Sequence, residues 1–69
     1  IIYPNPAQDF LNIKHSNYIT LVEIYDANNN IIYSYKNTSN MNIELLSSGM
    51  YFVKIYYEDK VVLEKIVKN

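Results

Sequence analysis

The feature that most constrains this chain is that its apolar residues come in short runs, each closed by a cluster of turn-forming residues. The runs are rich in Ile, Val, Tyr and Phe, the β-branched and aromatic side chains that pack well on a pleated sheet. Asn, Asp, Ser and Pro dominate the clusters between them and supply local turn chemistry. No segment keeps a helical repeat of apolar residues over roughly 11 positions or more. The chain is therefore predicted to be all-β.

The runs define about seven short strands, a number and spacing typical of a β-sandwich or a small barrel. We predict these strands at Ile1–Tyr3, Phe10–Lys14, Tyr18–Tyr25, Ile31–Tyr35, Met41–Ile43, Met50–Tyr57 and Val61–Val67.

Alternation along a strand predicts which side chains face the interior, because successive side chains point to opposite faces of the sheet. In Met50–Tyr57 the odd-numbered positions are apolar or aromatic and share one face, opposite Lys54. In Tyr18–Tyr25 both faces carry apolar residues, so the pattern does not decide. We favour Val22 and Ile24 as the inward residues because the opposite face carries a glutamate.

Composition limits both the size of the domain and its partners. A chain of 69 residues forms one domain at most, and without Cys and with a single His it lacks the usual disulfide or metal support of a small core. Hydrophobic residues make up 49% of the chain and supply that core. The net charge is −1 and every basic residue is Lys, so neither a nucleic acid nor an anionic lipid surface is indicated. No apolar run approaches the roughly 20 residues of a transmembrane helix, so membrane insertion is not expected.

Catalytic residues are not expected. His15 is the only imidazole, and its position in a polar turn after a strand favours a solvated loop residue over a member of a nucleophilic triad. Glu58 and Asp59 are neighbours in a tight hairpin, where their side chains point apart and stay hydrated. Neither carboxyl is then placed for general acid–base catalysis.

The sequence gives little support for a metal site or a sugar site, and we predict no cofactor. The loop Asp26–Asn30 alternates side-chain oxygens, but the Gly and the Glu of an EF-hand are missing and a strand begins at Ile31. We prefer a turn in which Asn accepts the left-handed conformation. The tyrosines could stack on a sugar, yet most lie in strands beside aliphatic residues, where they add to the core.

Three local patterns are more specific. In Tyr3-Pro4-Asn5-Pro6, two prolines fix φ twice and make a rigid approach to the first long strand. The run Leu46–Ile55 joins a Leu, a turn ending in Gly49 and an alternating strand that carries Tyr51. This run is similar to the tyrosine corner of Ig-like sandwiches, where the Tyr hydroxyl bonds to backbone just upstream. The third pattern is Glu64–Asn69, which reads as the end of a strand closed by lysine.

In this order and spacing, the three patterns resemble the C-terminal sorting domain of type IX secretion cargo in Bacteroidetes, the Por secretion system type A sorting domain family. That family reads roughly Y-P-N-P, then I-Y-D and a turn with Gly, then L-x-x-G-x-Y-x-V-x-I, and closes on a basic, β-branched strand. The matching residues are Tyr3–Pro6 with Phe10-Leu11, Ile24–Asp26, Leu46 with Gly49–Ile55, and Lys65–Lys68. Asn29 stands where the family has its first Gly, and Ser47 where it often has Pro, changes that the backbone should tolerate.

The resemblance implies an Ig-like antiparallel β-sandwich of about seven short strands at the end of a larger exported protein. Residues 1–69 would be a single C-terminal sorting domain excised from that secreted protein, in keeping with a chain that opens on Ile1. Such a domain acts in the periplasm as an address for the outer-membrane type IX translocon and its shuttle and sortase proteins. It is commonly cleaved by the sortase, and the covalently linked N-terminal cargo domain reaches the cell surface or is secreted. The domain is a substrate in this process and no enzyme.

The resemblance also suggests where the translocon and the sortase make contact. We expect these recognition residues to be Pro4, Asn5, Pro6, Gly49, Tyr51, Lys65 and Lys68. Maintenance of the fold is the competing role for Pro4-Asn5-Pro6, Gly49 and Tyr51. Protection of an edge strand from aggregation is the competing role for the lysines. An exposed last strand could also pair weakly with a second copy. Two other functions stay open: an Ig-like or fibronectin-like surface module that binds glycan or a neighbouring domain, and a spacer in an adhesin array.

Overall fold

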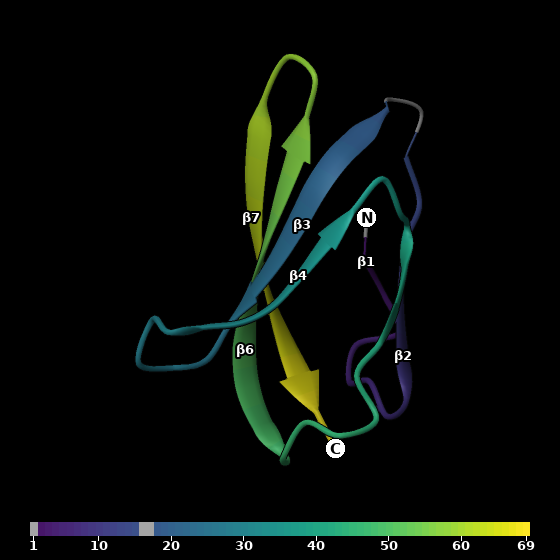
Figure 1. Ribbon diagram of the computed structural model, residues 1–69. Helices are drawn as coiled ribbons and strands as arrows, with labels where there is room; N and C mark the ends of the chain where they lie inside the picture. The colour runs from purple at the N-terminus through teal and green to yellow at the C-terminus, as the bar shows by residue number, and fades with distance from the viewer. Residues whose placement is uncertain (1, 16–17) are drawn as a thin grey trace.

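The computed structural model describes residues 2–15 and 18–69, and the regular structure within them is all β-strand (Figure 1). The strands are β1 (Ile2–Tyr3), β2 (Phe10–Ile13), β3 (Ile19–Tyr25), β4 (Ile31–Lys36), β5 (Asn40–Asn42), β6 (Gly49–Tyr57) and β7 (Val61–Lys68). Every predicted strand is present with its ends within one residue of the prediction, except that the predicted start at Ile1 lies outside the described residues. This part of the chain holds no helix that is long and apolar enough to cross a membrane.

The strands form two antiparallel sheets that pack together as a sandwich. The smaller sheet has the order β1-β2-β5 and the larger has the order β4-β3-β6-β7. The seven strands thus take the positions A, B, C, C′, E, F and G of an Ig-like sandwich. The prediction of an all-β, Ig-like sandwich with about seven strands is confirmed.

One hydrophobic core lies between the sheets and draws side chains from both of them. The largest fully buried side chains are Leu11, Val22, Ile24, Met41, Ile43, Val53, Ile55 and Ile66. Burial of an aliphatic side chain of this size stabilises a fold by about 1.5–3 kcal/mol relative to exposure. In a chain without disulfides, this core is the main source of stability.

The alternation of side chains in the long strands follows the predicted pattern. On β6 the odd-numbered residues from 51 to 55 are buried, while the even-numbered residues between them are only half-buried. On β3 Val22 and Ile24 are the fully buried residues. Ile19 is buried as well, although alternation counted from Val22 would place it outward. The pairing of β3 with β6 shifts by one residue between Ile19 and Leu21, and this β-bulge turns Ile19 toward the core.

The turn between β3 and β4 is built on Asp26. One carboxylate oxygen of Asp26 accepts the backbone N–H groups of Asn28 and Asn30, each at 2.9 Å. Asn29 has a φ of 68°, so it occupies the left-handed conformation that the sequence predicted. The N–H of Asn30, together with that of Asn28, holds the pKa of the Asp26 carboxyl below its ordinary value. The Asp26 carboxylate therefore stabilises the turn between β3 and β4.

Candidate functional site

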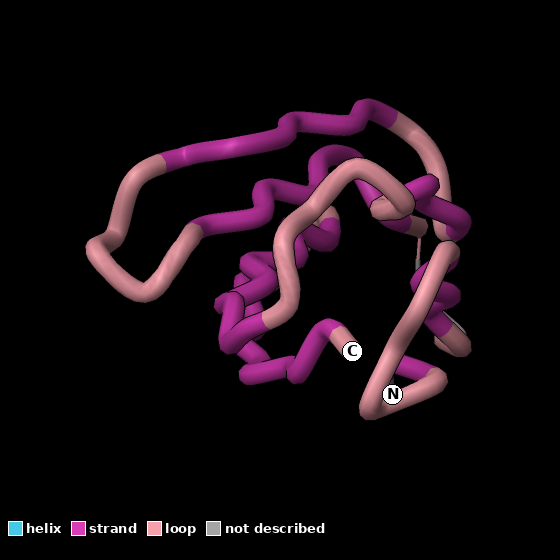
Figure 2. The backbone as a smooth tube through the Cα atoms, turned by 90° about the horizontal axis from the view of Figure 1, so that it is seen from below, coloured by secondary structure: helices cyan, strands magenta, loops and turns pink. Residues whose placement is uncertain are grey.

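The fold brings the three sequence patterns together along the C-terminal half of β7. Gly49 lies opposite Lys68 in the β6–β7 ladder, and Tyr51 lies opposite Ile66. On the other side of β7, the segment from Asn5 onward contacts the same strand. Figure 1 shows the C-terminal end of β7 beside the start of β6, and Figure 2 shows the C-terminus close to the N-terminal segment. We call this region, made of Pro4–Pro6, Gly49–Tyr51 and Lys65–Lys68, the β7 end.

Asn5 binds β7 through its side-chain amide. The amide nitrogen donates to the carbonyl oxygen of Lys65 at 3.3 Å, and the amide oxygen accepts the backbone N–H of Val67 at 3.0 Å. Two residues on, Ala7 forms a short parallel bridge in which its N–H bonds the Val67 carbonyl and its carbonyl accepts the N–H of Asn69, both at 2.8 Å. The N-terminal segment therefore covers the outer edge of β7 from Lys65 to the end.

Sequence reasoning predicted the rigidity of the Tyr-Pro-Asn-Pro segment and missed this contact. Proline has no backbone N–H, so a segment with two prolines cannot complete an ordinary strand ladder. An Asn side chain carries the same donor and acceptor as a peptide group and can replace the missing pair. An Asn placed between two prolines near a strand edge is a signal that could have indicated the contact.

Gly49 and Tyr51 shape the turn that leads into β6. The Tyr51 side chain is 7% exposed, and its hydroxyl donates to the carbonyl oxygen of Ser47 at 2.6 Å. This bond confirms the predicted tyrosine corner. Gly49 has a φ of 151°, a conformation that side-chain-bearing residues rarely adopt, although nothing lies within 4 Å of the place a Cβ would occupy. The backbone conformation rather than lack of space thus favours glycine here.

The two lysines of the β7 end point to opposite faces of the sheet. Lys65 is exposed on the outer face, where its cross-strand neighbour is Phe52. Lys68 shares the inward face with Ile66 and is only 8% exposed, with its Nζ donating to the backbone oxygen of Asn69 at 3.3 Å. Sequence reasoning treated the lysines as equivalent, although the two-residue period of a strand separates positions 65 and 68.

Exposed apolar side chains surround Lys65. Met50 and Val67 are cross-strand neighbours on the outer face and are 42% and 41% exposed. On the side of the N-terminal segment, the exposed prolines line a shallow groove of about 420 Å³ together with Gln8, Asp9, Phe10 and Asn69. The accessible part of the β7 end is therefore one ammonium group with apolar neighbours and a proline-lined groove beside it.

The residues considered for catalysis lie at the opposite end of the β6–β7 hairpin. The His15 ring packs 5.9 Å from the Tyr57 ring, and Lys60 Nζ lies 5.5 Å from the centre of the same ring. Glu58 and Asp59 are exposed in the turn that follows. Within residues 2–15 and 18–69, no three His, Cys, Asp or Glu side chains form a group that could hold a metal ion.

Of two comparisons with known proteins, one identifies a family. A search of the curated proteins gives no match. The model of the family described as "Secretion system C-terminal sorting domain" matches residues 1–69. This match spans the whole chain and so includes all three patterns that meet at the β7 end. The chain belongs to the family of secretion system C-terminal sorting domains, which serves type IX secretion.

Proposed function

We propose that the type IX export machinery recognises this domain through its folded β7 end, and that this contact directs the parent protein across the outer membrane. Family membership supplies the coarser function, a C-terminal sorting signal of type IX secretion attached to a cargo protein that leaves the cell. A sorting-signal domain is not an enzyme domain. The family match does not favour a generic module that binds glycan or a neighbouring domain.

The proposed function also includes the successive steps by which the parent protein leaves the cell. Residues 1–69 form one sorting domain excised from a larger secreted protein, and this domain acts while the parent is in the periplasm. A shuttle protein and the outer-membrane translocon bind it, and a surface sortase then removes it as the parent reaches the surface or the medium. The domain is the substrate of each of these proteins.

One observation carries the proposal: three patterns far apart in the sequence meet on a single strand. Asn5 lies 60 residues from Lys65 in the chain and still bonds its carbonyl, while the Gly49–Tyr51 segment pairs with the other side of the same strand. Asn5, Gly49, Tyr51 and the inward Lys68 hold the strand in place. We assign direct contact with the machinery to Lys65 and the exposed prolines, because exposed charge in a contact surface promotes encounter and selects partners.

The test is a fusion of residues 1–69 to a periplasm-targeted fluorescent reporter in a bacterium with a working type IX system. The measured quantity is the fraction of reporter found outside the cell or on its surface. We expect export in this strain and retention in the periplasm of the same strain without the translocon. A reporter that stays periplasmic in both strains would contradict the proposal.

A further inference from the structure

On the larger sheet, the outer face of the three strands β3, β6 and β7 is mostly apolar, in addition to the face that forms the core. Along each strand of an antiparallel sandwich, apolar side chains that face the core usually alternate with polar side chains that face solvent. The outward positions of the three strands β3, β6 and β7 are Leu21, Glu23, Tyr25, Met50, Phe52, Lys54, Tyr56, Val61, Leu63, Lys65 and Val67. Only three of these eleven, one Glu and two Lys, are charged, and the other eight are aliphatic or aromatic. We call these eleven residues the outer face.

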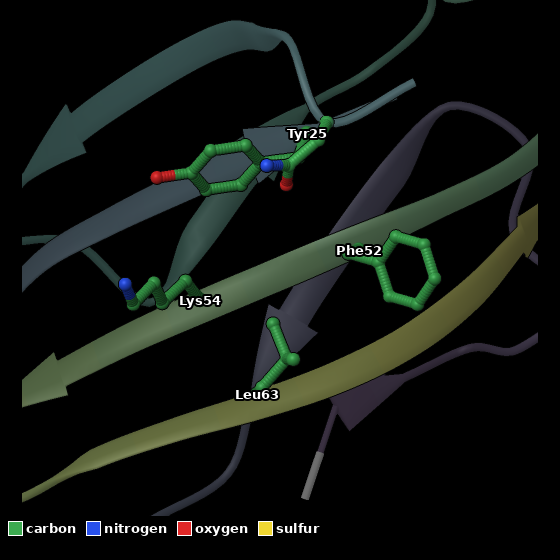
Figure 3. Close-up of a pocket in the computed structure, with 5 residues that line it drawn as sticks. Tyr25, Phe52, Lys54 and Leu63 are labelled. Atoms are coloured by element: carbon green, nitrogen blue, oxygen red, sulfur yellow. The ribbon is translucent and has the colours of Figure 1, made fainter. Parts of the chain in front are cut away.

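The outer face is hollowed at its centre. Tyr25, Phe52, Lys54 and Leu63 project from three neighbouring strands and, with Asn29, line a groove of about 330 Å³ (Figure 3). Leu63 is 63% exposed at this groove. A concave site with apolar walls and one ammonium group fits a protruding apolar side chain that has a carboxylate nearby.

The charges of the outer face favour an acidic partner. One carboxylate oxygen of Glu23 accepts the hydroxyl groups of Tyr25 at 2.9 Å and Tyr56 at 2.8 Å. Its cross-strand neighbour Lys54 places Nζ 5.5 Å from the centre of the Tyr56 ring. The outer face carries two positive charges, on Lys54 and Lys65, and one negative charge, on Glu23. Its formal charge is therefore +1, whereas the net charge of the whole chain is −1. A cationic, apolar face on an anionic domain is complementary to a partner surface with apolar and carboxylate groups.

We propose that the outer face docks a protein of the type IX machinery whose contact surface is apolar and acidic, an inference that rests on the proposed function. An apolar side chain of that protein enters the groove beside Leu63, and its carboxylates pair with Lys54 and Lys65. A second copy of the domain is disfavoured, because both copies would present a face of net positive charge to each other. A lipid surface is disfavoured because Glu23 and its tyrosine hydroxyls lie within the face and would lose water there.

Acidic substitutions on the outer face test this inference in the exported reporter fusion. We expect Leu63→Glu and Lys54→Glu each to lower the extracellular fraction at least about tenfold, as loss of a central contact does. The matched control is Leu45→Glu, because Leu45 is 87% exposed in the loop before β6 and lies outside the outer face. This control should be exported like wild type. Export of Leu63→Glu at the wild-type level, with its melting temperature unchanged, would overturn the inference.

A photo-crosslinking residue at position 63 of the wild-type fusion supplies a second measurement that does not depend on the stability of a variant. We expect an adduct with a type IX protein in exporting cells and no such adduct from position 45. An adduct only with a second copy, with lipopolysaccharide or with the reporter itself would overturn the inference, as would no adduct at all. Failure of the unaltered fusion to be exported overturns the proposed function as well, so the two failures are distinguishable.

Discussion

At the scale of single residues, the Tyr51 hydroxyl is the contact whose removal is easiest to interpret. The ring is buried and its hydroxyl donates to the Ser47 carbonyl at 2.6 Å. Tyr51→Phe keeps the ring and leaves that carbonyl without its partner. We expect a loss of about 1 kcal/mol in the free energy of unfolding and a fall of about 4–8 °C in melting temperature, measured by circular dichroism.

Tyr3→Phe is the matched control for this substitution. The Tyr3 side chain is 46% exposed, and its hydroxyl has no hydrogen bond within the described part of the chain. The melting temperature of Tyr3→Phe should equal that of wild type. Equal melting temperatures for both Phe variants would contradict a stabilising role for the tyrosine corner.

The Asp26 carboxylate gives the fold one identifiable dependence on pH. Its pKa is lowered in the folded state because the N–H of Asn30, together with that of Asn28, stabilises the ionised form. A lowered pKa contributes stability that is fully present above the ordinary Asp pKa of about 4 and is lost as the pH falls through the folded value. We expect wild type to melt above Asp26→Asn at about pH 7 and this difference to vanish toward about pH 2. A difference that stays constant across this range would show that ionisation of Asp26 is not involved.

At the scale of the elements, Asn5 determines how the outer edge of β7 is protected. Asn5→Ala removes the acceptor of the Val67 N–H and the donor to the Lys65 carbonyl. We expect faster hydrogen exchange at the Val67 amide and a loss of about 1 kcal/mol in the free energy of unfolding.

Asn5→Asp separates the two bonds of Asn5. A carboxylate can still accept the Val67 N–H but cannot donate to the Lys65 carbonyl. The Val67 amide should therefore stay protected in Asn5→Asp and lose protection in Asn5→Ala. Equal protection in wild type and Asn5→Ala would contradict the assigned contact.

Removal of the whole terminal segment Glu64–Asn69 should unfold the domain. This segment carries Ile66, which is fully buried, and pairs along β6 from Gly49 to Val53. Loss of one buried aliphatic side chain alone costs about 2–5 kcal/mol, while small domains have only about 5 kcal/mol or slightly more in total. We expect the truncated chain to lack the cooperative thermal transition, as measured by circular dichroism. A retained transition would mean that β7 is dispensable for the fold.

At the scale of the whole molecule, local sequence patterns were enough to predict the strands, whereas the choice of a sandwich over a small barrel came from the family resemblance. Short β-branched runs between turn residues define strands directly, and the tyrosine corner and the left-handed Asn29 are local features as well. The inward position of Ile19 depended on a feature that the pattern does not show. The bulge before Leu21 reverses the alternation that would have left Ile19 outward, and a bulge depends on pairing with another strand.

The candidate site was predictable as a set of residues but not as an arrangement. The Asn5 contact with β7 joins residues about 60 positions apart, and only the folded chain brings them together. The inward position of Lys68 required the register of β7, which fixes Ile66 and Lys68 on the same face. The sequence also offered no direct sign of the outer face, because its apolar residues are spread over three strands.

In the proposed function the export machinery recognises the folded β7 end, with Lys65 as its exposed charge. The most direct measurement is the extracellular fraction of the reporter fusion carrying Lys65→Glu, compared with Lys60→Glu in the β6–β7 turn. Both lysines are exposed, so melting temperatures close to wild type are expected for both variants. Recognition of the β7 end predicts that Lys65→Glu lowers export at least about tenfold while Lys60→Glu is exported like wild type. Equal export of the two folded variants would contradict it.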